Sequence, residues 1–98
     1  MLFLDTKHRL IEYAELFHGT IDSAEVHPRE VVKAAQRHNA AAVVISHDHP
    51  GGSPEPSAAD KVLTKQLKEV LTLVDVRTLD HIIVAGSKTT SFAERGLI

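Results

Sequence analysis

Two histidines, a serine and an aspartate lie close together near the middle of the chain, in a pattern that can bind a metal ion. His47 and His49 are two residues apart, and Ser57-x-x-Asp60 follows a loop rich in proline and glycine. Two neutral imidazoles and a carboxylate form a three-ligand set that leaves a fourth position for water, as in catalytic zinc sites. The spacing therefore predicts a zinc site made by His47, His49 and Asp60.

The segment that carries the histidines is expected to be a buried strand over residues 41–49. Residues 41–46 are an apolar run rich in β-branched side chains, which favours such a strand. Side chains two residues apart on a strand point to one face, with Cα atoms about 6.6 Å apart. His47 and His49 would therefore converge on one ion, before Pro-Gly-Gly at residues 50–52 turns the chain.

A long helix is predicted from residue 57 to about residue 73. Ser57 suits the N-cap, and Asp60 would lie near the positive end of the helix dipole and stay ionised. Apolar residues recur at helical spacing at Val62, Leu63, Leu67, Val70, Leu71 and Val74. However, Ser57-x-x-Asp60 is also an ordinary capping box, and the two histidines could simply be solvated. These two structural interpretations remain open as alternatives to the metal site.

The remaining segments predict a mixed sheet with two main helices. The expected elements are a strand at 1–5, a strand with an uncertain bulge at 10–20 that ends near Gly19, a helix that begins near Pro28 and stops at Asn39, a strand at 76–85, and a hairpin strand at 88–92. Together they indicate a single domain over residues 1–98 with an α+β or α/β/α sandwich architecture.

Composition limits the class of protein. The chain has 98 residues, of which 43% are hydrophobic, and this is enough for one globular core. A net charge of −2 without a basic run gives no support to a nucleic-acid surface. The absence of cysteine excludes a disulfide framework and a thiolate zinc site. No apolar run approaches the length of a membrane span, so we expect a cytoplasmic protein with no membrane contact.

Two motifs, His47-x-His49-Pro50-x-Gly52 and Pro56-Ser57-x-x-Asp60, resemble the metal-binding motif of the JAMM/MPN+ metallopeptidases. Within that superfamily the chain closely resembles the bacterial RadC-like (UPF0758-type) proteins. The resemblance covers nearly the whole chain, and further matching segments are residues 2–5, 16–21, 26–31, 79–84 and 91–92. It implies an MPN/JAMM-like architecture, similar to that of cytidine deaminases.

The resemblance implies His47, His49 and Asp60 as zinc ligands and Ser57 as a hydrogen-bonding group near the reacting oxygen. It also implies a general-base glutamate on the first core strand, just upstream of a Leu-Phe-Leu-Asp-like segment. In this chain Met1 directly precedes that segment, so the matching position lies before the first residue. We therefore expect an N-terminally shortened member, or one whose start has been placed too late, that lacks the beginning of its first core strand.

Other titratable residues are candidates for a replacement base or a second site. Glu12, Glu15 and Glu30 could each act as a base, but nothing in their spacing favours it, and Glu30 suits the first turn of a helix. Asp80 and His81 could form an acid–base pair. Neighbouring residues on a strand face opposite ways, which argues against that pair.

The sequence is compatible with three functions. The leading hypothesis is a zinc metallohydrolase of the peptidase or isopeptidase type, acting on an unknown peptide or protein substrate. The alternative is a non-catalytic metal-binding or protein-interaction module, with a possible DNA-repair association and possible homo-oligomers through an exposed sheet edge. The third is a metal-dependent nuclease. Large barrel hydrolases that use His-x-His are excluded by length, since such barrels need about 200 residues.

Overall fold

The fold is a five-stranded mixed sheet with two helices. The structure, a computed structural model, describes residues 1–16, 26–50 and 52–98. The elements in chain order are β1 (Leu2–Leu4), β2 (Leu10–Tyr13), α1 (Pro28–Arg37), β3 (Ala42–Asp48), α2 (Ala58–Leu73), β4 (Arg77–Ala85) and β5 (Lys88–Ser91). The sheet has the order β2-β1-β3-β4-β5, in which β3 and β4 are parallel and the other neighbours antiparallel. This confirms the expected α+β fold.

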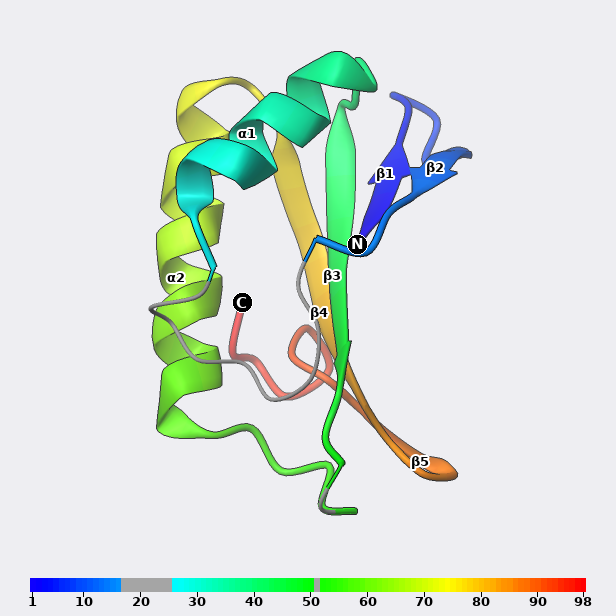
Figure 1. The fold of residues 1–98 in the computed structure, drawn as a ribbon, viewed down its shortest axis with the longest axis vertical. Helices are drawn as coiled ribbons and strands as arrows, with labels where there is room; N and C mark the ends of the chain where they lie inside the picture. The colour runs from blue at the N-terminus through cyan, green and yellow to red at the C-terminus, as the bar shows by residue number, and fades with distance from the viewer. Residues whose placement is uncertain (17–25, 51) are drawn as a thin grey trace.

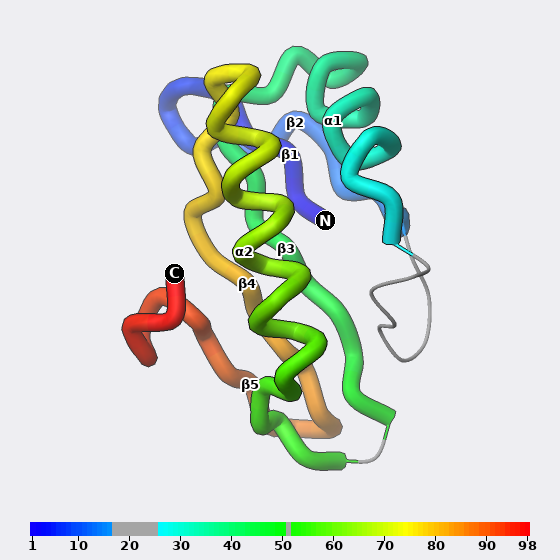
Figure 2. The backbone as a smooth tube through the Cα atoms, turned by 90° about the vertical axis from the view of Figure 1, so that its left-hand side faces the viewer, coloured from blue at the N-terminus to red at the C-terminus, as the bar shows by residue number. Residues whose placement is uncertain are grey.

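Both helices cover the same face of the sheet (Figure 1). Turned by 90°, they lie in front of the strands, with α2 over β3 and β4 (Figure 2). Phe3 of β1, Ile45 of β3 and Leu67 of α2 belong to one buried cluster, together with apolar residues of α1. The described residues therefore form two layers, and the core lies between the sheet and the helices.

Side chains of the central strand β3 alternate between the buried face of the sheet and the opposite face. Val43, Ile45 and His47 point into the core, whereas Val44 and Ser46 are only partly buried. A parallel neighbour requires a crossover connection, and α2 supplies it between β3 and β4. The end of β3 and the start of α2 consequently lie at the same end of the sheet, which is where the predicted metal ligands are.

Most predicted elements are confirmed, with small changes at their ends. Pro28 stands at the first turn of α1, and Asn39, the predicted stop, has a positive φ of 52° just after the C-cap. The strand predicted over residues 10–20 is shorter, since β2 ends at Tyr13, level with its three-residue partner β1. The expected bulge is present, because Phe3 pairs with Glu12 but Leu4 with Leu10. The predicted end near Gly19 lies outside the described residues.

We predict that Leu67→Ala lowers the free energy of unfolding by about 2–5 kcal/mol, because it removes a fully buried side chain and leaves a cavity. Urea unfolding of the purified chain measures this change. Leu73→Ala on the same helix is the control. Leu73 is 84% exposed, so the same substitution should change the unfolding free energy by less than about 0.5 kcal/mol. Equal losses in the two variants would contradict the packing described here.

Candidate metal centre

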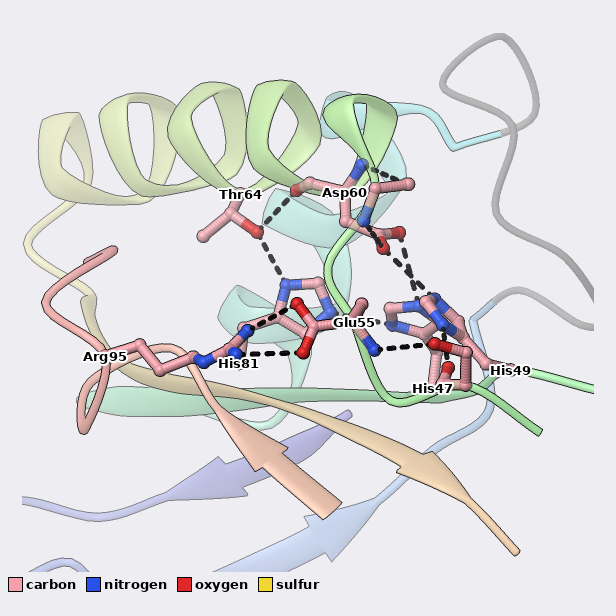
Figure 3. Close-up of polar contacts among 9 residues, drawn as sticks. His47, His49, Glu55, Asp60, Thr64, His81 and Arg95 are labelled. Carbon is pink, nitrogen blue, oxygen red and sulfur yellow. Dashed lines mark hydrogen bonds and ion pairs between the residues drawn. The ribbon is translucent and has the colours of Figure 1, made fainter. Parts of the chain in front are cut away.

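The two histidines of the His-x-His motif lie together at the end of β3. His47 is the penultimate residue of the strand, and His49 follows it directly. The backbone N–H of His49 donates to the carbonyl oxygen of Val84 at 2.9 Å, which continues the pairing with β4 by one residue. The ring centroids of His47 and His49 are 4.8 Å apart, and both rings lie beside the first turn of α2 (Figure 3). The convergence predicted from the i, i+2 spacing is therefore observed.

Asp60 joins the histidines from the first turn of α2. Ser57 is the N-cap, and its side chain accepts a hydrogen bond from the Asp60 N–H at 3.0 Å. Asp60 Oδ2 in turn accepts from the Ser57 N–H at 2.7 Å, which completes a capping box. The same carboxylate is buried and faces both imidazoles. The capping box and the approach to the histidines, weighed as alternatives in the sequence, occur together.

The geometry of these three side chains is compatible with a bound metal ion. One ligand atom from each of His47, His49 and Asp60 lies within 4.8 Å of the other two. Asp60 Oδ1 is 3.3 Å from His47 Nε2, and Asp60 Oδ2 is 3.0 Å from His49 Nε2. Two atoms bound tetrahedrally to zinc at about 2.1 Å are separated by roughly 3.4 Å, so these distances are near those of a ligand set. The described residues contain no other such group.

Hydrogen bonds to the far side of a ring indicate which nitrogen is available to a metal. His49 Nδ1 lies 2.9 Å from the carbonyl oxygen of Ser53, which can only accept, so Nδ1 carries the proton. In the neutral ring Nε2 then presents a lone pair to the Asp60 carboxylate. His47 Nε2 is buried and has no hydrogen-bond partner among the described residues, although it is close to Asp60. A cation between the His49 lone pair and the Asp60 carboxylate would stabilise both, and the unpartnered Nε2 of His47 beside them also fits a metal site.

His81 of β4 and Thr64 of α2 lie directly behind this site, and the sequence reasoning missed their role. His81 Nε2 is 2.7 Å from His47 Nδ1, and His81 Nδ1 is 2.6 Å from Thr64 Oγ1. Thr64 Oγ1 donates to the Asp60 carbonyl oxygen at 2.7 Å. One signal was available, because a histidine on the buried face of a strand must find polar partners.

The suggested Asp80–His81 acid–base pair is not present. Asp80 accepts hydrogen bonds from Ser91 Oγ and the Ala93 N–H, and it meets His81 only at the backbone N–H. The His81 ring points the other way, into the core, where it stacks on Phe92 with centroids 4.5 Å apart. Neighbouring side chains on β4 thus face opposite ways, as strand alternation predicts.

The suggested replacement bases are not part of the cluster of possible ligands. That cluster contains Asp60 as its one carboxylate among the residues that the structure describes. Glu30 is exposed on the first turn of α1 and lies 3.9 Å from Lys33, and Glu12 is exposed on β2. Glu15 is exposed, near the end of the described range 1–16. Glu55, on the loop before α2, forms a two-pronged ion pair with Arg95 (Figure 3).

Burial and charge set the protonation states around the cluster. Burial raises the pKa of the Asp60 carboxyl, but the hydrogen bonds from Ser57 and the two histidines outweigh this, and the pKa lies below its ordinary value. Burial lowers the pKa of His47, against the opposing effect of Asp60. Burial, and after it His47, lowers the pKa of His81 to about 3. Near neutral pH the carboxylate is therefore ionised, and His47 and His81 are neutral.

We predict that the metal-free chain loses stability as the pH falls below 6.5. The unfolded chain protonates the residue 81 imidazole near pH 6.5 and the folded chain only near pH 3. The contribution of neutral His81 to the free energy of unfolding is therefore complete above pH 6.5. Below that pH, about 1.4 kcal/mol of this stability is lost for each pH unit. Urea unfolding in chelator, from about pH 7 to about pH 4.5, measures this slope.

In this experiment His81→Phe should make the slope of the profile smaller over that range, whatever its effect on stability at pH 7, and the slope that remains includes the contribution of His47, whose pKa is also lowered. His27→Gln is the control, because His27 is exposed at the start of α1 and makes no cap hydrogen bond. It should keep the slope of the unmodified chain. An unchanged slope in His81→Phe would contradict the assignment of this pH dependence to His81.

Comparison with known proteins agrees with the motif. A family described as the RadC-like JAB domain matches residues 1–97 of the chain. A UPF0758 protein of Nitrosococcus oceani is 62% identical over 97 residues, which are 99% of this chain and 43% of that protein. UPF0758 protein Smlt0399 of Stenotrophomonas maltophilia is 60% identical over 97 residues, which are 99% of this chain and 42% of that protein.

A UPF0758 protein of Vibrio cholerae is 59% identical over 96 residues, which are 98% of this chain and 60% of that protein. The chain thus spans less than half the length of the Nitrosococcus and Stenotrophomonas relatives. The family match covers almost every residue, from β1 to the C-terminal turn, and includes the His-x-His and Ser-x-x-Asp motifs. The chain therefore belongs to the RadC-like JAB domain family.

Proposed function

We propose that this chain is the zinc-binding part of a metallohydrolase of the peptidase or isopeptidase type, with His47, His49 and Asp60 as the ligands. The observation that carries the proposal is the approach of one buried carboxylate to both Nε2 atoms, at 3.3 and 3.0 Å. Two nitrogens and one oxygen suit zinc and leave a position for water. Zinc bound there would supply a water of lowered pKa and would polarise the carbonyl of the substrate.

We propose that Ser57 stabilises the oxyanion that forms when the amide carbonyl is attacked. In the capping box the Ser57 oxygen acts as an acceptor for the Asp60 N–H. A hydroxyl has one proton to donate besides its acceptor lone pairs, so the cap leaves the Ser57 proton available. Ser57 is exposed beside the buried Asp60, where a substrate could reach it. Loss of one oxyanion donor typically slows catalysis by about 100–1,000-fold.

The register of β1 supports a location for the general base that the family resemblance implies. Leu2 pairs with Val44 and Phe3 with Val43 in antiparallel order. If a strand continues this register before Met1, the position two residues before Met1 lies opposite His47, and the position four residues before it lies opposite His49. Both positions share the core face of Phe3, because the side-chain period of a strand is two. A glutamate on that extension would be beside the metal ligands.

The alternative is a non-catalytic metal-binding or protein-interaction module. It is favoured by the ligand cluster, which within the described residues holds Asp60 but no second carboxylate that could act as base. An exposed edge suits association, since β2 ends the sheet and Leu10 is 59% exposed. The described parts of the chain contain no helix that could cross a membrane. A cytoplasmic location and a DNA-repair association belong to this proposal as expectations.

We predict about one zinc ion per chain, measured by mass spectrometry on untagged protein after exposure to zinc and removal of the excess. His49→Ala should lose most of this zinc, because it removes one of three ligands. Asp60→Asn should also lose it while the fold survives, since an asparagine at this position remains short and polar. His38→Ala is the control, because this histidine follows α1 and lies outside the cluster. Zinc-free unmodified chain would refute the proposal.

We further predict that cleavage of internally quenched peptides requires β1 to be extended with a glutamate on the core face. The chain of 98 residues should bind zinc and cleave slowly or not at all, because its described residues bring no second carboxylate to the ligand cluster for proton transfer. In the extended protein, Ser57→Ala should reduce kcat by about 100-fold or more with zinc retained. No cleavage above background by the extended protein, with glutamate or with glutamine, would favour the non-catalytic module as the function of this site.

A further inference from the structure

A buried chain of hydrogen bonds connects the two sides of the proposed ligand set. It runs from the His47 ring to the His81 ring at 2.7 Å, from His81 to the Thr64 hydroxyl at 2.6 Å, and from Thr64 to the Asp60 carbonyl at 2.7 Å (Figure 3). His81 is fully buried and Thr64 is 2% exposed. The chain therefore joins β3, β4 and α2 inside the core, and it begins and ends on proposed ligands.

The direction of each hydrogen bond follows from the donors and acceptors available. A carbonyl oxygen only accepts, so the single proton of the Thr64 hydroxyl points to Asp60. Thr64 Oγ1 must then accept from His81, whose proton lies on Nδ1. A neutral His81 has a lone pair on Nε2, which accepts the proton of His47 Nδ1. His47 consequently has no proton on Nε2, the atom that faces the Asp60 carboxylate.

We propose that Thr64 and His81 are positioning residues that fix the tautomer of His47 and hold its Nε2 free for the metal. This inference rests on the proposed metal site and adds two residues to it. Partners of this kind, which orient a ligating imidazole through its other nitrogen, typically change metal affinity by about 10–100-fold when they are removed. Both residues are buried behind the His47 ring, so their effect on the metal would pass through His47.

Comparison of the two histidine ligands supports this role. His49 Nδ1 donates to the backbone carbonyl of Ser53, which fixes its tautomer without any side chain. His47 lies deeper, and its Nδ1 meets a side chain instead of a carbonyl. A second imidazole does not have a fixed direction, because each of its nitrogens can donate or accept. Thr64 removes that freedom, since its only proton is already committed to the helix backbone.

Packing alone does not require these residues. His81 stacks on Phe92 and lies next to an aliphatic core, where an apolar side chain of similar size would avoid the burial of two polar nitrogens. A histidine at this place is stable because both nitrogens have partners, and one of these partners is a proposed metal ligand. The contacts therefore indicate that position 81 is polar because its side chain must hydrogen-bond the ring of His47.

The direct test is the tautomer of His47 in metal-free protein, read by long-range 1H–15N NMR of the seven histidines with assignment by single His variants. We expect the proton on Nδ1 of His47 and of His81 in the unmodified chain. In Thr64→Val the His81 proton loses its acceptor and should move to Nε2, which drives the His47 proton to its own Nε2. A His47 proton on Nε2 in the unmodified chain would overturn the inference, whether or not any variant folds.

The second readout is the affinity for Zn²⁺ alone, measured by competition with a chromophoric chelator. Thr64→Val should bind zinc at least 10-fold more weakly, because the metal must first displace a proton from His47 Nε2. Thr64→Ser keeps the hydroxyl and should restore both the tautomer and the affinity. Thr72→Val is the matched control. Thr72 Oγ1 donates the same kind of hydrogen bond to the carbonyl oxygen four residues earlier, that of Lys68, at 2.7 Å, but Thr72 is exposed on α2.

The outcomes separate this inference from the proposed function. Zinc binding by the unmodified chain with unchanged affinity in Thr64→Val overturns the positioning role and leaves the zinc site in place. Loss of affinity in Thr64→Ser equal to that in Thr64→Val also overturns it, because the hydroxyl would then not matter. An unmodified chain without zinc affinity refutes the metal site, while the NMR result still decides whether Thr64 and His81 set the tautomer.

Discussion

The organisation of this molecule depends on one carboxylate that serves the backbone and the site together. Asp60 Oδ2 accepts a hydrogen bond from the Ser57 N–H, which starts α2 at a fixed residue. Both carboxylate oxygens lie close to imidazole nitrogens, of His47 in β3 and of His49 just after it. The first turn of the helix is thus attached to the end of the central strand. A carboxylate near a helix N-terminus is favoured by the helix dipole, so the cap and the site stabilise the same ionised state.

The core of this domain is consequently not purely apolar. Aliphatic side chains fill the space between the sheet and the helices, but His47, Asp60, Thr64 and His81 interrupt them at one end. Each buried polar group is costly unless it has partners. Here the partners come from three elements that the β3–α2–β4 crossover brings together. The topology therefore supplies the hydrogen bonds that offset the desolvation of these buried polar groups.

The sequence predicts the local parts of this arrangement well and the distant parts poorly. The approach of His47 to His49 follows from strand alternation, and Asp60 follows from the capping pattern, because both depend on neighbouring residues. The contact of His47 with His81 depends on the parallel pairing of β3 with β4, which shifts between Val43 and Val44. No local pattern encodes that shift. Similarly, β2 is shorter than its alternation predicts, because its length follows its partner β1.

The ligand atoms of the candidate site come from one continuous segment, residues 47–60, that contains the end of β3, a loop and the first turn of α2. A cation held there would join the two ends of this short segment. The entropy cost of such a closure depends only weakly on the number of residues in the loop. Its main effect would be on local unfolding of this segment, with little influence on the far end of the sheet. Amide hydrogen exchange in the first turn of α2 would then report occupancy of the site, without any substrate.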